Sequence, residues 1–282
     1  MTKGPKQQKA LVVPAQHAMP GIQTIDVPSP GVNEVLVRVK AMSLSPGDEL
    51  VKGIGPPWFE YPTVLGFDAA GVVVELAEGV DNLVVGNKLI IQAFAKFPHD
   101  LHSGGYRQYA VVPADIVVQI FDNLGFNEAF TLLTNLATAL AGLFGDNRRA
   151  GLAPFWTGEG KDGYKKQPIL ILSGAKFYGS LYNSLNLQGP PPLSLGVTYV
   201  IDCTHSRSQL VSESCDTVPQ RFQTIYDAFA ISETQKAYDI LASGGTLIFV
   251  KPSALDSEKA KENKKVREGF ASCLHTAVVD NR

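Results

Sequence analysis

Short apolar runs separated by glycine- and proline-containing turns fill the first 120 residues. Residues 9–13 (KALVV) predict a strand, and residues 35–40 alternate valine with Leu36, Arg38 and Lys40, the period-two pattern of a half-buried strand. Further apolar strands are predicted at 71–76 and within EGVDNLVVGNKLIIQ and GGYRQYAVVPADIVVQI. Many short strands with this punctuation predict an antiparallel barrel-like domain that ends near residue 120.

Beyond residue 120 the apolar spacing becomes helical. Residues 127–145 predict one helix with Asn127 as its N-cap. Short apolar strands are predicted at 169–172, 197–201, 224–229 and 246–250, with helices at 180–188 and 232–241 between them. The strand at 169–172 (ILIL) has the composition of a fully buried strand. Strands that alternate with helices predict a parallel sheet, so the fold class is α/β.

Residues 167–180 (QPILILSGAKFYGS) combine a strand, a glycine-containing loop and a helix. This is the opening unit of a dinucleotide-binding fold, in which backbone N–H groups and the helix N-terminus bind a pyrophosphate. No register of a regular G-x-G-x-x-G fits the loop, so an ordinary strand–loop–helix junction is the alternative interpretation. The candidate phosphate-binding residues are Gly174, Ala175, Lys176, Phe177, Tyr178 and Gly179.

Net charge and cysteine content indicate which partners and which cellular compartment to expect. The formal net charge is −2, which gives no reason to expect a nucleic acid or an anionic membrane as partner. The three cysteines all lie in the second half and include no C-x-x-C, as in cytosolic proteins. No signal-peptide h-region and no run of 18 apolar residues occurs, so we expect a cytoplasmic protein.

Several segments resemble the medium-chain dehydrogenase/reductase superfamily. They are residues 11–51, the turn GFDAAGVV at 66–73, GGYRQYAVVPAD, ATALAGLFG and YDILASGGTLIFV. The resemblance is strongest over residues 9–145, and it is to the zinc-free branch with its fungal trans-acting enoyl reductases and quinone reductase-like proteins. It implies a GroES-like antiparallel β-barrel domain at 1–122 and a shortened Rossmann-type dinucleotide-binding domain at 123–255. Residues 256–282 would begin the segment that returns to the first domain.

The resemblance also bears on zinc. Zinc-dependent relatives have a cysteine near the position of Ser45 and a histidine beside the position of Gly66. This chain has Ser45 and Phe67 there, and no cysteine precedes Cys203. Thiolate and imidazole groups supply the affinity of such a site, so we expect no zinc.

The same resemblance implies the site residues. It places Ser45 and Asp48 where substrate and nicotinamide meet, and Thr138 against the nicotinamide. The alternative for Thr138 is a hydroxyl that bonds to its own helix backbone. Besides residues 174–179, the implied cofactor-binding residues are His205, Ser206, Arg207, Ser208 and Val250. Arg207 and the two serines favour the 2′-phosphate of NADPH, whereas Asp202 would suit a free ribose diol and leaves NADH open.

The implied function is a zinc-independent, NADPH-dependent reductase of an activated C=C bond in an enoyl thioester, enone or quinone. The small-molecule substrate could be bound to an acyl carrier or a polyketide synthase, and the protein could be a monomer or a homodimer. Tyr106 and Tyr109 are candidate proton donors, with a core role as the alternative. The bulky Phe177 and Tyr178 and a short segment between Cys215 and Thr224 favour a second reading. In that reading the chain is an inactive, shortened relative that serves as a structural or interaction module. The shortened segment also predicts local disorder or weak packing around residues 186–224.

Overall fold

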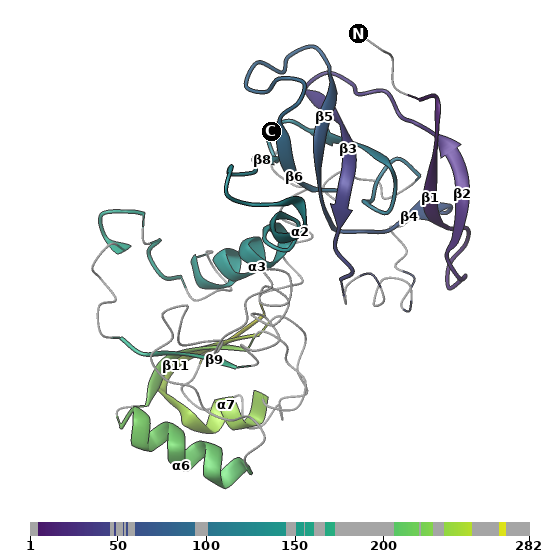
Figure 1. The fold of residues 1–282 in the computed structure, drawn as a ribbon. Coiled ribbons are helices and arrows are strands. Elements are labelled where there is room, and N and C mark those ends of the chain that lie inside the picture. The colour runs from purple at the N-terminus through teal and green to yellow at the C-terminus, as the bar shows by residue number, and fades with distance from the viewer. Residues whose placement is uncertain are drawn as a thin grey trace. The chain divides into compact units, whose positions relative to one another are not determined.

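The computed structural model describes residues 5–45, 48, 53, 55, 60–93, 101–144, 151–154, 156–160, 167–172, 206–219, 221–227, 234–249 and 265–268. They form two compact units, the first up to Thr134 and the second from Asn135 onward, and each is described by itself (Figure 1). The sequence places the boundary after residue 122, whereas the compact units change over inside helix α3, Leu133–Phe144. No helix among the described residues combines the length and apolar character needed to cross a membrane.

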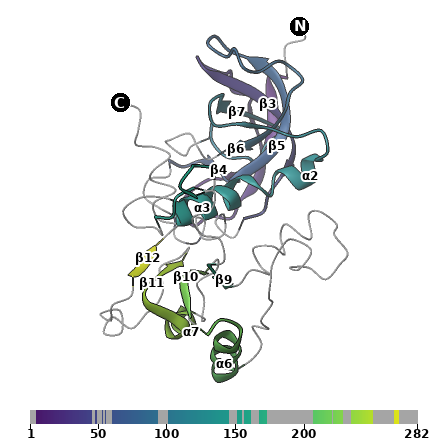
Figure 2. The ribbon, with the colours of Figure 1, turned by 90° about the vertical axis from the view of Figure 1, so that its left-hand side faces the viewer.

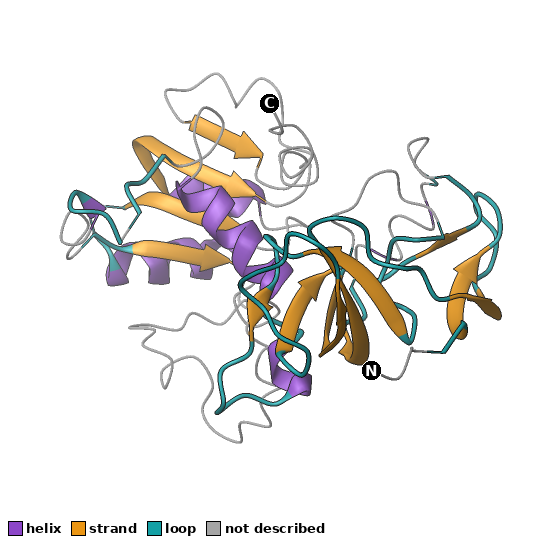
Figure 3. Cartoon of the chain, turned by 90° about the horizontal axis from the view of Figure 1, so that it is seen from above, coloured by secondary structure: helices purple, strands orange, loops and turns teal. Residues whose placement is uncertain are grey.

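The first unit consists of two antiparallel sheets (Figures 1 and 3). Three strands form one sheet in the order β2-β1-β4, and five strands form the other in the order β7-β3-β5-β6-β8. The strands are β1 Gln7–Val13, β2 Gly21–Asp26, β3 Glu34–Met42, β4 Thr63–Val64, β5 Asp68–Leu76, β6 Lys88–Gln92, β7 Tyr109–Pro113 and β8 Val118–Gln119. The antiparallel fold expected for the first domain is therefore confirmed.

The apolar pattern of the strands builds two cores. Val35 and Val37 of β3 lie fully buried in a cluster with Leu89 and Ile91 of β6, as their alternation predicts. The intervening Leu36 is buried as well, so both faces of β3 are covered at its start. A second cluster joins β1, β4 and the segment before β7, with these buried members: Ala10, Val12, Val13, Val64, Leu65, Phe67 and Tyr106.

The prediction of one helix over 127–145 is wrong. Two helices occur instead, the short α2, Phe126–Ala129, and α3, Leu133–Phe144. The N-cap of α2 is Gly125 rather than Asn127, and no side chain caps it. The break follows from Thr131, whose hydroxyl donates to the carbonyl of Glu128 at 2.8 Å and closes the chain into a turn.

The second unit contains a parallel sheet with strand order β12-β11-β10-β9 (Figure 2). Its elements are β9 Ile169–Leu172, α6 Arg207–Thr217, β10 Phe222–Asp227, α7 Thr234–Ile240, β11 Leu241–Phe249 and β12 Lys265–Glu268. The parallel sheet and the α/β class are confirmed. The strand predicted at 197–201 and the helix predicted at 180–188 lie outside the described residues.

Side chains from both faces of β10 and β11 pack against other parts of the second unit. Ile225 and Leu247 lie in a cluster with Ala237 and Tyr238 of α7. On the adjacent positions, Tyr226 and Ile248 approach Gly142 of α3 so closely that an added Cβ would lie 2.8 Å and 3.3 Å from their side chains. Residues of neighbouring sequence position thus face opposite sides of the sheet, as the strand geometry requires.

Two expectations for this unit fail. Ile169 and Ile171 of β9 are 42% and 37% exposed, so this strand is not fully buried. Only the alternate residues Leu170 and Leu172 pack against the core, because β9 is the last described strand on its side of the sheet. The expected weak packing over 186–224 is wrong at its end, where α6 leads into the buried Val218. Residues 186–205 lie outside the described part of the chain.

Candidate functional site

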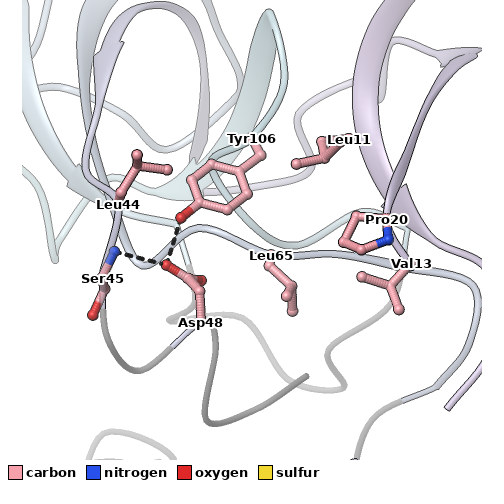
Figure 4. A pocket seen from close by; sticks show the side chains of 8 residues that line it. All are labelled: Leu11, Val13, Pro20, Leu44, Ser45, Asp48, Leu65 and Tyr106. Atoms are coloured by element: carbon pink, nitrogen blue, oxygen red, sulfur yellow. Dashed lines mark hydrogen bonds between the residues drawn. The ribbon is translucent and has the colours of Figure 1, made fainter. Parts of the chain in front are cut away.

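A buried carboxyl group, that of Asp48, connects three segments of the first unit. The hydroxyl of Tyr106 donates to Oδ2 at 2.6 Å, and the backbone N–H of Ser45 donates to the same oxygen at 3.1 Å. The backbone N–H of Gly66 donates to Oδ1 at 2.8 Å. Figure 4 shows the Tyr106 hydroxyl and the backbone nitrogen of Ser45 directed at Asp48 from two sides. The carboxyl group therefore holds the segment after β3 against the β4–β5 turn and against the segment before β7.

Gly66 makes this arrangement possible. Its φ of +106° is a backbone conformation that other residues rarely adopt, and it directs the N–H at Asp48. A Cβ at this position would lie 2.8 Å from Cδ1 of Tyr106. The turn therefore needs glycine at this position, both for its backbone conformation and because the Tyr106 ring packs where a side chain would lie.

Burial decides the protonation of the pair. Burial raises the pKa of Asp48 above its ordinary value, and the hydrogen bonds from Tyr106, Gly66 and Ser45 oppose that rise. Burial, together with the neighbouring Asp48 carboxylate, raises the pKa of Tyr106 far above the ordinary value for a phenol. The phenol therefore stays protonated at neutral pH and remains a hydrogen-bond donor.

A cavity of about 260 Å³ borders this network (Figure 4). Apolar side chains form most of its wall, and the polar residues gather at one end. The lining residues are Leu11, Val13, Pro20, Leu44, Ser45, Asp48, Leu65 and Tyr106. All of them belong to the first unit.

A second buried carboxyl group, Asp68 at the start of β5, binds the start of α3. It accepts hydrogen bonds from the backbone N–H and the hydroxyl of Thr134, at 3.1 Å and 2.7 Å. Burial raises its pKa to about 6, and the charge of Asp48 adds to that rise. Asp68 thus caps a helix from a distant strand, and its carboxylate satisfies N-terminal donors of α3.

The predicted catalytic residues fall into both units. Ser45 and Asp48 lie together at the cavity of the first unit, with Tyr106 beside them. Thr138 lies on α3 in the second unit and is 8% exposed. Its proposed contact with a nicotinamide stays a prediction.

Two of the predicted cofactor-binding residues are at the start of α6. Ser206 is the N-cap of α6, and its side chain and that of Gln209 form a capping box. The hydroxyl oxygens of Ser206 and Ser208 are 3.2 Å apart. These serines, with Val211 and Ser212, line an open hollow of about 700 Å³. Residues 174–179, His205 and Val250 lie outside the described residues, as does the side chain of Arg207.

Within the described ranges, no group of three or more His, Cys, Asp and Glu side chains is arranged to hold a metal ion. Phe67, at the position where zinc-dependent relatives have histidine, is a core residue that is 4% exposed.

Sequence reasoning missed the apolar lining of the cavity. Leu11, Val13 and Leu65 resemble any other core residues of short strands, and their sequence carries no sign of a cavity. The sequence names both Tyr106 and Tyr109 as candidate proton donors, and the hydrogen bond to Asp48 distinguishes Tyr106 from Tyr109. That pairing joins residues 58 positions apart, which no local pattern could have found.

Comparison with known proteins agrees with this description. The alcohol dehydrogenase GroES-like domain matches residues 31–122. The trans-enoyl reductase apdC of Emericella nidulans is 31% identical over 162 residues, which cover 57% of this chain and 47% of that protein. The dehydrogenase pigH of Monascus ruber is 31% identical over 166 residues, which cover 56% of this chain and 44% of that protein. The chain thus spans about half the length of the curated relatives it matches.

Solved structures show the same fold. An alcohol dehydrogenase superfamily protein from Novosphingobium aromaticivorans has a TM-score of 0.74 at 20% identity, covering 97% of this chain and 82% of that one. The CurK enoyl reductase has a TM-score of 0.67 at 18% identity, covering 97% of this chain and 86% of that one. Residues 31–122 thus match the alcohol dehydrogenase GroES-like domain, and the chain is similar in sequence to a fungal trans-enoyl reductase and in fold to an alcohol dehydrogenase superfamily protein.

Proposed function

We propose that this protein is a zinc-independent, NADPH-dependent oxidoreductase that reduces an activated C=C bond of an enoyl thioester, enone or quinone. One observation carries the proposal. The Asp48 carboxyl group holds the backbone of Ser45 at the wall of a largely apolar cavity, where a substrate would meet it. The similarity to a trans-enoyl reductase supplies the reaction class, and an acyl-carrier or polyketide synthase-bound substrate belongs to the same proposal.

Reduction of such a bond needs a hydride and a group that stabilises the negative charge developing on the substrate's carbonyl oxygen. NADPH supplies the hydride when it is bound. The hydroxyl of Ser45 is the proposed donor to the carbonyl oxygen, because Asp48 fixes the Ser45 backbone. Tyr106 serves as a positioning residue, since its proton is directed at Asp48. Thr138 is the proposed contact of the nicotinamide amide from α3.

The start of α6 is the proposed binding site for the 2′-phosphate of the cofactor. Three hydroxyl groups, those of Ser206, Ser208 and Ser212, line one hollow at the start of α6. The Ser206 hydroxyl donates to Oε1 of Gln209 at 2.7 Å, so Ser208 and Ser212 are the proposed donors to the 2′-phosphate that distinguishes NADPH from NADH. Their place beside a helix N-terminus favours a negative charge. The absence of a zinc requirement is proposed because apolar Phe67 lies in the core where an imidazole ligand would be needed.

The first test is a fluorescence titration of the 282-residue chain with NADPH and with NADH, followed by turnover of an enoyl thioester. We expect tighter binding of NADPH, and Ser208→Ala should weaken NADPH binding without affecting NADH. Ser243→Ala is the matched control, because Ser243 is an exposed residue of β11 outside the hollow. If neither nucleotide binds to the folded protein, the reductase proposal fails, and the alternative of an inactive structural or interaction module stands.

A second test addresses the chemistry. Ser45→Ala should lower kcat/KM about a hundredfold, the usual effect of removing one donor to a developing oxyanion. Ser43→Ala is the control, since Ser43 lies two positions away and its hydroxyl donates to the Asp68 carbonyl at 3.4 Å instead of lining the cavity. Equal losses in the two variants would contradict the role of Ser45.

A further inference from the structure

The cavity beside Asp48 is preformed by backbone hydrogen bonds between its walls. The N–H of Leu11 donates to the carbonyl of Tyr106 at 2.9 Å, and the N–H of Tyr106 donates to the carbonyl of Leu65 at 3.0 Å. Val13 pairs with Thr63 of β4 in the same sheet. Three segments that line the cavity are therefore fixed to one another whether or not a ligand is present, as is usual for ligand pockets.

The Asp48 carboxyl group and the Tyr106 hydroxyl, at the polar end of the cavity, already take part in hydrogen bonds within the protein. Both oxygens of Asp48 accept hydrogen bonds, and the hydroxyl of Tyr106 donates to one of them. A polar ligand group would compete with these bonds, and any donor or acceptor left without a partner on burial weakens binding. An apolar ligand group leaves the network unchanged.

The remaining residues that line the cavity are apolar, and those on one side of the cavity are more exposed to solvent than those on the other. Val13 and Leu65 are core residues, whereas Leu44 is 88% exposed, so its side of the cavity borders solvent. Burial of apolar surface against such a wall favours aliphatic groups. The volume of about 260 Å³ limits their number, because a group the size of a water molecule takes about 30 Å³. The cavity therefore has room for about eight carbon atoms.

We infer that this cavity binds the aliphatic tail of the substrate, and that the proposed reductase therefore acts on acyl compounds with a straight tail of up to about eight carbons in the cavity. The inference rests on the proposed function, because only a reductase would use the bound aliphatic compound as a substrate. It adds the substrate class and assigns its recognition to Leu11, Val13, Pro20, Leu44 and Leu65. Ser45, at the polar end of the same cavity, then lies where the thioester of that substrate would begin.

The test is calorimetric titration of the full chain with saturated N-acetylcysteamine thioesters, from butanoyl to dodecanoyl. These probes cannot be reduced, so their binding is independent of turnover. Each added methylene should tighten binding about fourfold until the cavity is filled, after which the dissociation constant should level off. A dissociation constant that does not depend on tail length in a protein that still reduces a crotonyl thioester overturns the inference and leaves the reductase standing.

Two substitutions at one half-buried position make the test specific. Leu11→Phe adds three carbon atoms to the wall, so the plateau should shift to tails about three carbons shorter, and Leu11→Ala should shift it by about three carbons in the opposite direction. Ile116→Phe is the matched control, because it adds the same three atoms at an exposed position outside the cavity. A shift in Ile116→Phe, or none in either Leu11 variant, overturns the assignment of the tail to this cavity. Length-dependent binding without turnover of any enoyl thioester removes the reductase function while the aliphatic site remains.

Discussion

Replacing Tyr106 by phenylalanine removes one oxygen atom from the buried network and leaves the ring in place. In the wild-type protein this hydroxyl donates to the Asp48 carboxyl group at 2.6 Å. Without it, the carboxyl group keeps two donors among the described residues, the backbone N–H groups of Gly66 and Ser45. The substitution should therefore destabilise the first unit and loosen the segment that carries Ser45.

The magnitude depends on the charge of Asp48. A hydrogen bond to a charged group stabilises a protein by about 1.5–3 kcal/mol, whereas a neutral one contributes about 0.5–1.5 kcal/mol. The Asp48 pKa is raised in the folded protein, so the favourable contribution of the protonated carboxyl group is present at low pH and lost as the pH rises through that pKa. The Tyr106 hydrogen bond opposes this rise, and its removal raises the pKa of Asp48 further. The loss of stability in Tyr106→Phe should therefore be larger at pH 8 than at pH 5.

Denaturant unfolding of the wild type and Tyr106→Phe at pH 5 and pH 8 measures the loss of stability at each pH. Amide hydrogen exchange at pH 8 then locates the residues that lose protection. The amides of Gly66 and Ser45 should lose protection first, because both donate to Asp48. Tyr109→Phe is the matched control, since Tyr109 is a half-buried residue of β7 outside the cavity. Equal destabilisation at the two pH values, or an equal cost for Tyr109→Phe, would refute the reasoning.

Three further substitutions test separate parts of the structure. Burial raises the pKa of Asp68 from 3.8 to about 6, so its ionisation costs about 3 kcal/mol as the pH rises through that range. The stability of Asp68→Asn relative to the wild type should therefore increase from pH 4 to pH 8 in thermal unfolding, and a pH-independent difference would contradict this. Gly142→Ala should lower the free energy of unfolding in urea by about 1–2 kcal/mol, because the new Cβ would lie 2.8 Å from the Tyr226 ring. This overpacking outweighs the gain in helix propensity, which is at most about 1 kcal/mol, and a stabilised variant would contradict the prediction. Ser206→Ala should lower the free energy of unfolding by about 1 kcal/mol, because α6 loses its N-cap. The helical circular dichroism signal should then melt at a lower temperature, and an unchanged melting curve would contradict the capping role.

The sequence by itself determined the two kinds of sheet. The valines of β3 alternate along the strand, and the short strands around it end at glycine-containing turns. Such strands need to bury an apolar face, and an antiparallel fold provides this. Apolar runs separated by helical segments in the second half predict crossover connections, which join the parallel strands of the observed sheet. The residues Ser45 and Asp48 could also be selected from the sequence, because their segment resembles that of the family and the resemblance names the positions.

Tertiary structure decided where side chains meet. Helix α3 begins at Leu133, where Asp68, a residue of a distant strand, accepts a hydrogen bond from the N–H of Thr134, and a local periodicity contains no such partner. The exposure of Ile169 and Ile171 depends on the place of β9 in the sheet, since strand order is set by long-range pairing. The contact of Asp48 with Tyr106 and the cavity beside it likewise require β1, β4 and the segment before β7 to pair in one register. Sequence patterns fix which face of an element is apolar, but only the paired chain fixes which residues those faces enclose.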